Sequence, residues 1–330
     1  ARGGDVVVSY AFDREDLGSA VYRPRAHVPL LRDPDDARYR HAGVSTGQPD
    51  GEATPAAGDL MTFAHIAAEA LEVLEDGRTV GRDLLAIIKA DVDRLGRIFA
   101  EGLRGDRSPA RIAQLSRLIE AYFTERLPWL LAQTPEFRAI YTVYAGGDDL
   151  LLVSPWRAAM PFAVALREDF GTFSGGNPDI TLSAGIAFVH PKHPLASAVE
   201  TAEEALERAK AAGRNRLGLF DRVLSWDSAR ATLELAEALN AVVREGLLPP
   251  TVLHRMRWFA ARRAMAEQGD EQAADWNPKW RYHESRLLDG TEARFRDRLA
   301  ATLRDALPPP GQAQPADAEL AITIALWRNR

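Results

Sequence analysis

The stretch that decides the fold is IYTVYAGGDDLLLV, residues 140–153. Its apolar halves predict two β-strands, 139–145 and 150–153, because β-branched and aromatic residues favour extended backbone. Between them stands Gly146-Gly147-Asp148-Asp149, and glycine beside aspartate is a strong signal for a tight hairpin turn. The stretch therefore predicts an antiparallel hairpin with two carboxylates at its tip.

A second stretch, LLAIIKADVD at residues 84–93, predicts the strand that accompanies this hairpin. Its continuous apolar run over 84–90 is typical of a strand buried on both faces. The run ends at Asp91-Val92-Asp93, so two further carboxylates stand at the exit of a buried strand.

The remaining patterns complete an α+β domain. They predict helices over 94–104, 108–132, 156–172 and 195–212, and strands over 180–188 and 216–220. Ser108 followed by Pro109 is a typical helix start. The order is that of a ferredoxin-like βαββαβ fold, with a central antiparallel sheet and helices on one face.

Three segments divide the chain of 330 residues. Residues 1–60 are predicted to be a linker or partial domain, with a strand over 6–12 and an irregular loop rich in Pro, Gly and Asp over 23–59. Residues 61–221 form the α+β domain, which opens on a short helix over 61–75. Strand signals stop at about 222, which predicts an all-α domain over 222–330.

Composition excludes several classes of protein. The chain has no cysteine, which removes disulfides, zinc ribbons and cysteine nucleophiles and favours a reducing cytoplasm. No apolar run approaches the ~20 residues that span a bilayer, so no membrane contact is expected. The net charge of -6 is not typical of a free-standing nucleic-acid binder.

The two acidic motifs predict a metal site. In a βαββαβ sheet the first and third core strands are neighbours, which brings Asp91 beside Asp148 and Asp149. Mg²⁺ prefers oxygen ligands and is usually held by one or two carboxylates together with substrate phosphates. Gly146 and Gly147 suit a tight turn and let a triphosphate approach the backbone closely. The alternative is that both motifs are ordinary solvated turns.

A basic segment ends the helix over 195–212. In AKAAGRNR, residues 209–216, Lys210 and Arg214 are candidates to bind the phosphates of a nucleotide. The alternative is structural, because basic residues favour a helix C-terminus and Gly213 is a natural C-cap.

The order of these motifs resembles the palm domain of class III nucleotidyl cyclases and GGDEF diguanylate cyclases. It is more similar to the second palm and helical C-terminal domain of the large polymerase/cyclase subunit of type III-A CRISPR–Cas effector complexes. Leu95-Gly96 and GGDD in place of GGDEF favour this branch. The segments that carry the resemblance are KADVDRLGRIFAEGL (89–103), LSRLIEAYF (115–123), the GGDD hairpin, NPDITLSAGIAF (177–188) and the helix over 194–213.

The resemblance implies a role for each metal ligand. Asp91, the carbonyl of Val92 and Asp148 would ligate Mg²⁺ or Mn²⁺, and Asp149 would hold a second ion or help to activate a 3′-hydroxyl. Asp93 would not bind the ion itself but would support the residues that do.

The resemblance also implies the nucleotide contacts. Gly146 and Gly147 would lie against the triphosphate of ATP, and Lys210 and Arg214 would bind it. Ser116 would contact the base or ribose, although an exposed helical serine is an equal alternative.

The activity implied is synthesis of cyclic oligoadenylate second messengers from ATP, inside an RNA-guided antiviral complex. The implied partners are the other subunits, a guide RNA and a target RNA. The chain lacks the His-Asp dipeptide of the family's nuclease domain, one of its two palms and its inter-palm cysteines. We therefore expect the C-terminal part of a longer subunit, which binds ATP yet is poorly active alone.

Two other functions stay open. The same metal site would serve a stand-alone diguanylate or adenylate cyclase, and a non-catalytic scaffold would bind ATP without turnover. In the helical tail, Trp258, Trp276 and Trp280 stand among arginines. Such a face is a candidate to dock a partner through Arg255, Arg257, Arg262 and Arg263, unless the tryptophans are simply core.

Overall fold

The computed structural model describes residues 26–44, 55–102 and 108–330. The strand predicted over 6–12 lies outside these residues. The chain forms two compact units, one up to Thr79 and from Asp83 to Trp226, the other made of Val80–Arg82 and Asp227–Arg330. Within the described residues no helix is both long and apolar enough to cross a membrane.

The first unit is built on a six-stranded sheet in the order β4-β5-β3-β6-β7-β8. Its first four strands in that list have the order of a ferredoxin-like fold, which confirms the predicted class. One strand was missed, because β8 lies where the sequence shows no strand signal. The strands are β3 (Leu85–Val92), β4 (Tyr141–Gly146), β5 (Asp149–Pro155), β6 (Leu182–Val189), β7 (Arg216–Leu219) and β8 (Arg222–Ser225).

Strand β3 is the centre of the sheet. It pairs antiparallel with β5 on one side and with β6 on the other, while β7 joins β6 in parallel. Ala86, Ile87 and Ile88 of β3 have no exposed surface. The continuous apolar run therefore corresponds to a strand covered on both faces, as the sequence predicts.

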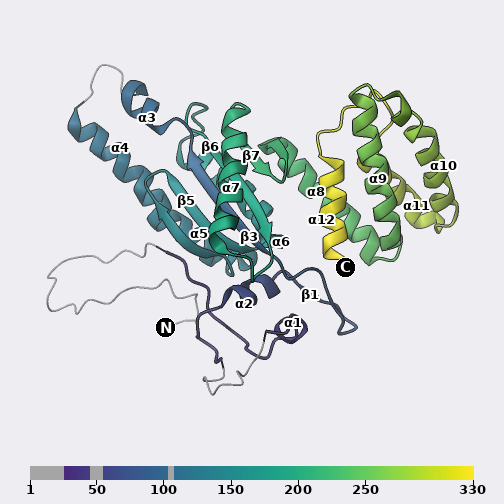
Figure 1. Ribbon diagram of the computed structural model, residues 1–330, viewed down its shortest axis with the longest axis horizontal. Coiled ribbons are helices and arrows are strands. Elements are labelled where there is room, and N and C mark those ends of the chain that lie inside the picture. The colour runs from purple at the N-terminus through teal and green to yellow at the C-terminus, as the bar shows by residue number, and fades with distance from the viewer. Residues whose placement is uncertain (1–25, 45–54, 103–107) are drawn as a thin grey trace. The chain divides into compact units, whose positions relative to one another are not determined.

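One face of the sheet is covered by α7 (Leu195–Ala211) and α2 (Phe63–Ala68), and Figure 1 shows α7 lying across the strands. Leu85 and Ile87 pack in a cluster with Ile66 of α2 and Ala202 of α7. The helix comes so close that a Cβ atom on Gly185 of β6 would lie 2.2 Å from the carbonyl oxygen of Ala202. Small residues on both elements thus allow this approach.

The opposite face is covered by α6 (Trp156–Phe173) and by the helical segment from α4 to α5. Ile88 and Ala90 alternate onto this face and are fully buried. Tyr122 packs edge-on against Phe170 of α6 and against Phe123. The helices of the βαββαβ order therefore lie on one face, as predicted, and α7, which follows the last strand of that order, covers the other.

The helix predicted over 108–132 is interrupted. It consists of α4 (Pro109–Ala121), a π-helical turn (Tyr122–Arg126) and α5 (Leu127–Gln133). Pro128 lacks the N–H that a continuous α-helix would use, which accounts for the break. Ser108 caps α4 as predicted, since its hydroxyl accepts from the N–H of Arg111 at 3.4 Å. The helix predicted over 94–104 is α3 (Leu95–Arg97) followed by a π-helical turn (Ile98–Gly102).

The helix predicted over 61–75, before β3, is shorter in the structure. Helix α2 ends at Ala68, and β1 (Glu72–Val73) and β2 (Thr79–Val80) follow. In the preceding segment, α1 (Ala37–His41) is packed rather than irregular, with Tyr39 buried. The backbone N–H of Thr142 on β4 donates to the carbonyl of His27 at 2.8 Å, which ties this segment to the edge of the sheet.

The second unit is helical, with buried Trp276 and Trp280 and half-exposed Trp258. Arg263 is buried, and its guanidinium donates to Glu267 at 2.8 Å. The proposed docking role of Arg263 was therefore wrong, because its group is committed internally. The long helices of this unit are α8 (Trp226–Arg244), α9 (Pro250–Glu267), α10 (Trp276–Asp289), α11 (Ala293–Ala306) and α12 (Ala318–Arg328). A 3-10 turn at Glu271–Ala273 lies between α9 and α10, and another at Pro135–Phe137 belongs to the first unit.

Candidate active site

The two acidic motifs meet at one end of the sheet. Asp91 on β3 is the ladder partner of Asp149 on β5. The backbone N–H of Val92 donates to the carbonyl of Asp148 at 3.0 Å, beyond the last ladder pair. The structure thus brings together the carboxylate-bearing residues of both motifs at the end of β3.

The hairpin turn contains fewer residues than the four-residue motif predicted to form it. Gly146 and Asp149 still pair in the ladder, so only Gly147 and Asp148 form the turn. Gly147 has a φ of 62°, which suits the first central position of a type II′ turn. Asp149 was predicted to lie in the turn, but the pairing extends to it and makes it a strand residue.

Lys210 comes from the last turn of α7 to the carboxylates. Its ammonium group lies 3.0 Å from Oδ2 of Asp91 and 3.1 Å from Oε1 of Glu207. The side chains of Lys210 and Asp91 are each about one-fifth exposed. Lys210 is therefore a close counter-charge for Asp91, and their partial burial means that water screens the pair only in part.

The pKa values of Asp91 and Lys210 reflect both burial and the charges around them. Burial raises the pKa of the Asp91 carboxyl, Asp148 and Asp149 add to that rise, and Lys210 only opposes it. Burial works against the charged form of Lys210, but hydrogen bonds to Asp91 and Glu207 outweigh it and raise the Lys210 pKa. The site thus resists a further negative charge and favours a positive one.

Sequence reasoning missed Lys89. It lies two residues before Asp91 on the same face of β3, forms an ion pair with Glu203 of α7 and lies 4.0 Å from Oδ2 of Asp149. The other carboxylate oxygen of Asp149 accepts from the N–H of Leu150 at 3.0 Å. The strand alternation is the signal that would have found it, since a lysine in an apolar run shares the face of Asp91.

Asp93 lies inside the protein rather than in solvent. It is 2% exposed and accepts hydrogen bonds from the hydroxyls of Thr181 and Ser183 at 2.7 and 2.6 Å. The backbone N–H of Asn215 donates to it at 2.9 Å. Asp93 thus joins β3 to the start of β6 and to the segment that follows α7.

For the other predicted site residues the structure shows the position in the chain's elements and the burial. Arg214 follows α7 and is partly buried, and Ser116 is exposed on α4. Val92 is buried at the end of β3, beside Leu182. The roles of these three residues stay predictions.

The donor set has the chemistry of a magnesium site, since Asp91, Asp148 and Asp149 offer hard carboxylate oxygens. The influence of Asp148 and Asp149 on the Asp91 pKa places these charges within electrostatic reach of one another. Within residues 26–44, 55–102 and 108–330, however, no three His, Cys, Asp or Glu side chains gather closely enough to hold an ion as they stand. The residues fit a cation in kind, with Lys210 as the present counter-charge.

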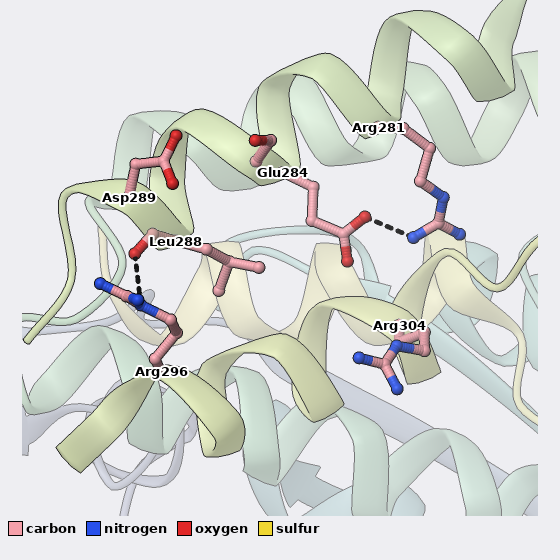
Figure 2. A pocket seen from close by; sticks show the side chains of 7 residues that line it. Arg281, Glu284, Leu288, Asp289, Arg296 and Arg304 are labelled. Carbon is pink, nitrogen blue, oxygen red and sulfur yellow. Dashed lines mark hydrogen bonds and ion pairs between the residues drawn. The ribbon is translucent and has the colours of Figure 1, made fainter. Parts of the chain in front are cut away.

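A pocket of about 440 Å³ lies in the second unit, and Figure 2 shows it between α10 and α11. An ion pair joins Arg281 to Glu284, and Arg296 donates to the carbonyl of Leu288 at 3.1 Å. The lining of this pocket includes none of the predicted site residues. The lining is Arg281, Glu284, Ser285, Leu288, Asp289, Arg296 and Arg304.

Comparisons with known proteins agree with this geometry. The sequence profile of the family "Cas10/Cmr2, second palm domain" matches residues 84–218. The "CRISPR system single-strand-specific deoxyribonuclease Cas10/Csm1 (subtype III-A)" of Methanocaldococcus jannaschii is 38% identical over an alignment 190 residues long, which covers 51% of this chain and 23% of the relative. The chain thus spans about a quarter of that relative.

Solved structures show the same fold. A Csm1-Csm4 cassette in complex with one ATP has a TM-score of 0.60 at 21% identity, covering 83% of this chain and 38% of the other. A Csm1-Csm4 cassette in complex with cA4 has a TM-score of 0.58 at 20% identity, covering 83% and 39%. The resemblance to the type III-A large subunit is therefore confirmed, and residues 84–218 match the model of the Cas10/Cmr2 second palm domain.

Proposed function

We propose that this chain carries the nucleotide-joining site of a type III CRISPR effector complex, and that the site makes cyclic oligoadenylates from ATP. The observation that carries the proposal is the pairing of Asp91 with Asp149 beside Lys210 of α7. The ATP and cA4 bound to similar folds support the choice of substrate and product.

The reaction would be attack of a ribose 3′-hydroxyl on the α-phosphate of ATP, forming a phosphodiester and releasing pyrophosphate. Asp91, the carbonyl of Val92, Asp148 and Asp149 would hold Mg²⁺, or Mn²⁺ in its place. The bound ion supplies charge neutralisation at the phosphates and lowers the pKa of the attacking hydroxyl. Catalysis of this kind depends mainly on positioning and electrostatic stabilisation.

The chain's own residues would bind and orient the substrate. Lys210 would leave Asp91 for the triphosphate when a divalent ion takes over the carboxylate, because both are cations that compete for the same oxygens. Gly147, with its positive φ and no side chain, leaves the turn backbone open to a phosphate. Arg214 would add a second basic group, and Ser116 a contact to base or ribose.

The proposed partners are the other subunits of the complex, a guide RNA and a target RNA that switches the site on. The similar cassettes contain a second subunit, Csm4, which supports a subunit partner for this chain. We further propose that the chain alone binds ATP but turns it over poorly.

The test is incubation with labelled ATP and Mg²⁺ or Mn²⁺, with and without the other subunits, guide and target RNA. The control variant is Asp148→Ala with Asp149→Ala. We expect target-dependent cyclic oligoadenylates from the wild type and none from the variant. Equal product from both, or none in the assembled complex, would contradict the proposal. A cyclic product from GTP would favour the diguanylate cyclase alternative, and ATP binding without turnover the scaffold.

A further inference from the structure

The segment that follows α7 has an unusual backbone. Gly213, Arg214 and Asn215 have φ values of 120°, 67° and 50° in succession. Glycine adopts positive φ freely and asparagine tolerates it, but arginine is disfavoured there because its Cβ crowds the following carbonyl. Such a conformation persists only where surrounding contacts hold it.

Two contacts of Asn215 hold the end of this segment. Its backbone N–H donates to Oδ2 of Asp93 at 2.9 Å, and its side-chain oxygen accepts from Nε of Arg167 at 2.8 Å. The first contact is the stronger kind, because a carboxylate oxygen accepts it in a buried setting.

Asp93 is itself fixed by β6. Its oxygens accept from Thr181 and Ser183, and its backbone N–H donates to the carbonyl of Thr181 at 2.8 Å. With the bond from Asn215, the Asp93 carboxylate therefore accepts from three protein donors. It lies at the end of the strand that carries Asp91. This commitment sets it apart from the carboxylates on the hairpin tip.

The segment held in this way is the continuation of the helix turn that bears Lys210. The N–H of Gly213 donates to the carbonyl of Lys210 at 3.3 Å, and the N–H of Arg214 donates to that of Ala209 at 3.2 Å. A restraint on Asn215 is thus transmitted through hydrogen bonds to the backbone of Lys210 and Arg214. The same restraint is anchored two residues from Asp91.

We propose that Asp93 is a positioning residue for the triphosphate of the nucleotide. By holding Asn215, it keeps Lys210 and Arg214 at a fixed place relative to Asp91 and so sets the affinity for the β- and γ-phosphates. The inference rests on the proposed function, because it takes a nucleoside triphosphate as the ligand. It assigns Asp93 no contact with metal or substrate.

Asp93→Asn is the sharpest variant. Asparagine has the same shape, and its amide still offers an oxygen to Asn215 and Thr181 and a donor to Ser183, so the fold is retained. The hydrogen bond to Asn215 loses its charge assistance, and charge-assisted bonds are about twice as strong as neutral ones. We expect the dissociation constant for ATP to rise about five- to tenfold.

The experiment uses the 330-residue chain and titrates ATP, AMP and Mn²⁺ separately. Calorimetry follows the nucleotides, and electron paramagnetic resonance follows the free Mn²⁺. Asp93→Asn should weaken ATP binding, leave the affinity for AMP unchanged and retain Mn²⁺ binding. Asp221→Asn, which removes a charge that is 89% exposed, is the matched control and should change none of the three.

Asn215→Gly is a second variant that should fold whatever Asp93→Asn does. Glycine accepts the positive φ and keeps the N–H, but it loosens the segment and loses the contact with Arg167. We expect it to weaken ATP binding as well, with AMP again unaffected. Unchanged ATP affinity in this variant would overturn the positioning role.

The other outcomes of these experiments are decisive as well. Wild-type ATP affinity in Asp93→Asn, or an equal loss for ATP and AMP, overturns the inference. Loss of Mn²⁺ binding in Asp93→Asn makes Asp93 a ligand and overturns it too. A wild type that binds ATP without forming product in the full complex overturns only the proposed function, whereas one that binds no ATP overturns both.

Discussion

The ammonium group of Lys210 on α7 lies 3.0 Å from Oδ2 of Asp91 on β3. This ion pair joins a predicted phosphate-binding residue to a predicted metal ligand. A divalent ion that binds Asp91 would compete with Lys210 for the same carboxylate, because both charges are positive. If Asp91 binds the ion as proposed, the arrangement would couple cation binding to the release of Lys210 towards a phosphate.

Lys210→Met should lower stability in the absence of ions and increase the response to ions. Its removal leaves Asp91 charged and largely buried among like charges, which costs about 1–2 kcal/mol for a pair with this partial exposure. We expect the Tm to fall by a few degrees without Mn²⁺ and to rise more on adding Mn²⁺ than in the wild type. Thermal unfolding with and without Mn²⁺ measures both.

The matched control is Lys192→Met, which removes an exposed lysine of the same unit. It should change neither the Tm nor the response to Mn²⁺. A Mn²⁺ response in Lys210→Met equal to that of the wild type would show that Asp91 and Lys210 are not coupled to cation binding.

The acidic motifs could be predicted from sequence because short-range patterns determine them. The apolar run before Asp91 and the hairpin signal around Gly147 set strand ends that the pairing of Asp91 with Asp149 brings into register. The glycine and aspartate of the turn likewise belong to a local signal. The fold order followed from the same strands, which is why the class was confirmed.

The partners of these residues could not be predicted in the same way. The acceptor of Lys89 is 114 residues away on α7, and the donors to Asp93 are 88 to 122 residues away. No local pattern states which side chains cross such distances. The face that α7 covers could not be predicted for a related reason, since its close approach depends on the absence of a side chain at Gly185 of β6.

Glu203→Gln should destabilise the first unit, and a second substitution should restore it. The side chain of Lys89 is only 16% exposed, so losing Glu203 leaves its charge with Asp149 at 4.0 Å as its remaining carboxylate. We expect a loss of about 1 kcal/mol in the free energy of unfolding, discounted for the exposure of Glu203. Lys89→Met added to Glu203→Gln should recover most of it, because no unpaired charge then remains.

Urea unfolding of the two single variants and the double variant measures this coupling. Additive losses, with the double variant the least stable of the three, would mean that the ion pair contributes nothing. Lys89→Arg provides the charge-conserving comparison and should stay close to the wild type.

Gly185→Ala should displace α7 from the sheet. The added Cβ would lie 2.2 Å from the carbonyl oxygen of Ala202 and 2.3 Å from the backbone nitrogen of Leu206, and backbone cannot move aside cheaply. We expect a loss of about 3 kcal/mol, measured by urea unfolding. Because Lys210 ends the same helix, the response of the Tm to Mn²⁺ should change as well.

Gly96→Ala is the comparison that separates crowding from the general effect of removing a glycine. Nothing lies within 4 Å of a Cβ built on Gly96, which is in α3. Alanine there should be neutral or stabilise the protein by up to about 1 kcal/mol. Equal losses in both variants would mean that the contact between α7 and β6 is not responsible.

The stability of the first unit should fall with acid through His65. This histidine is buried on α2, and burial lowers its pKa while Glu69 works in the opposite direction. A lowered folded pKa means that the unfolded state binds the proton more readily, so the stabilisation is present above about pH 6.5 and is lost as the pH falls below it. The loss of stability at this position corresponds to the uptake of one proton, which the imidazole of His65 binds when the protein unfolds.

His65→Gln should therefore remove part of this acid sensitivity. Glutamine at the third helical position still completes the capping box with Thr62, so stability at pH 7.5 should be nearly unchanged. At pH 5.5 the variant should be more stable than the wild type in urea, because no proton is gained on unfolding at this position. The exposed His190→Gln should leave the difference between the two pH values as it is in the wild type. Equal losses on acidification in His65→Gln and the wild type would place the sensitivity on another group.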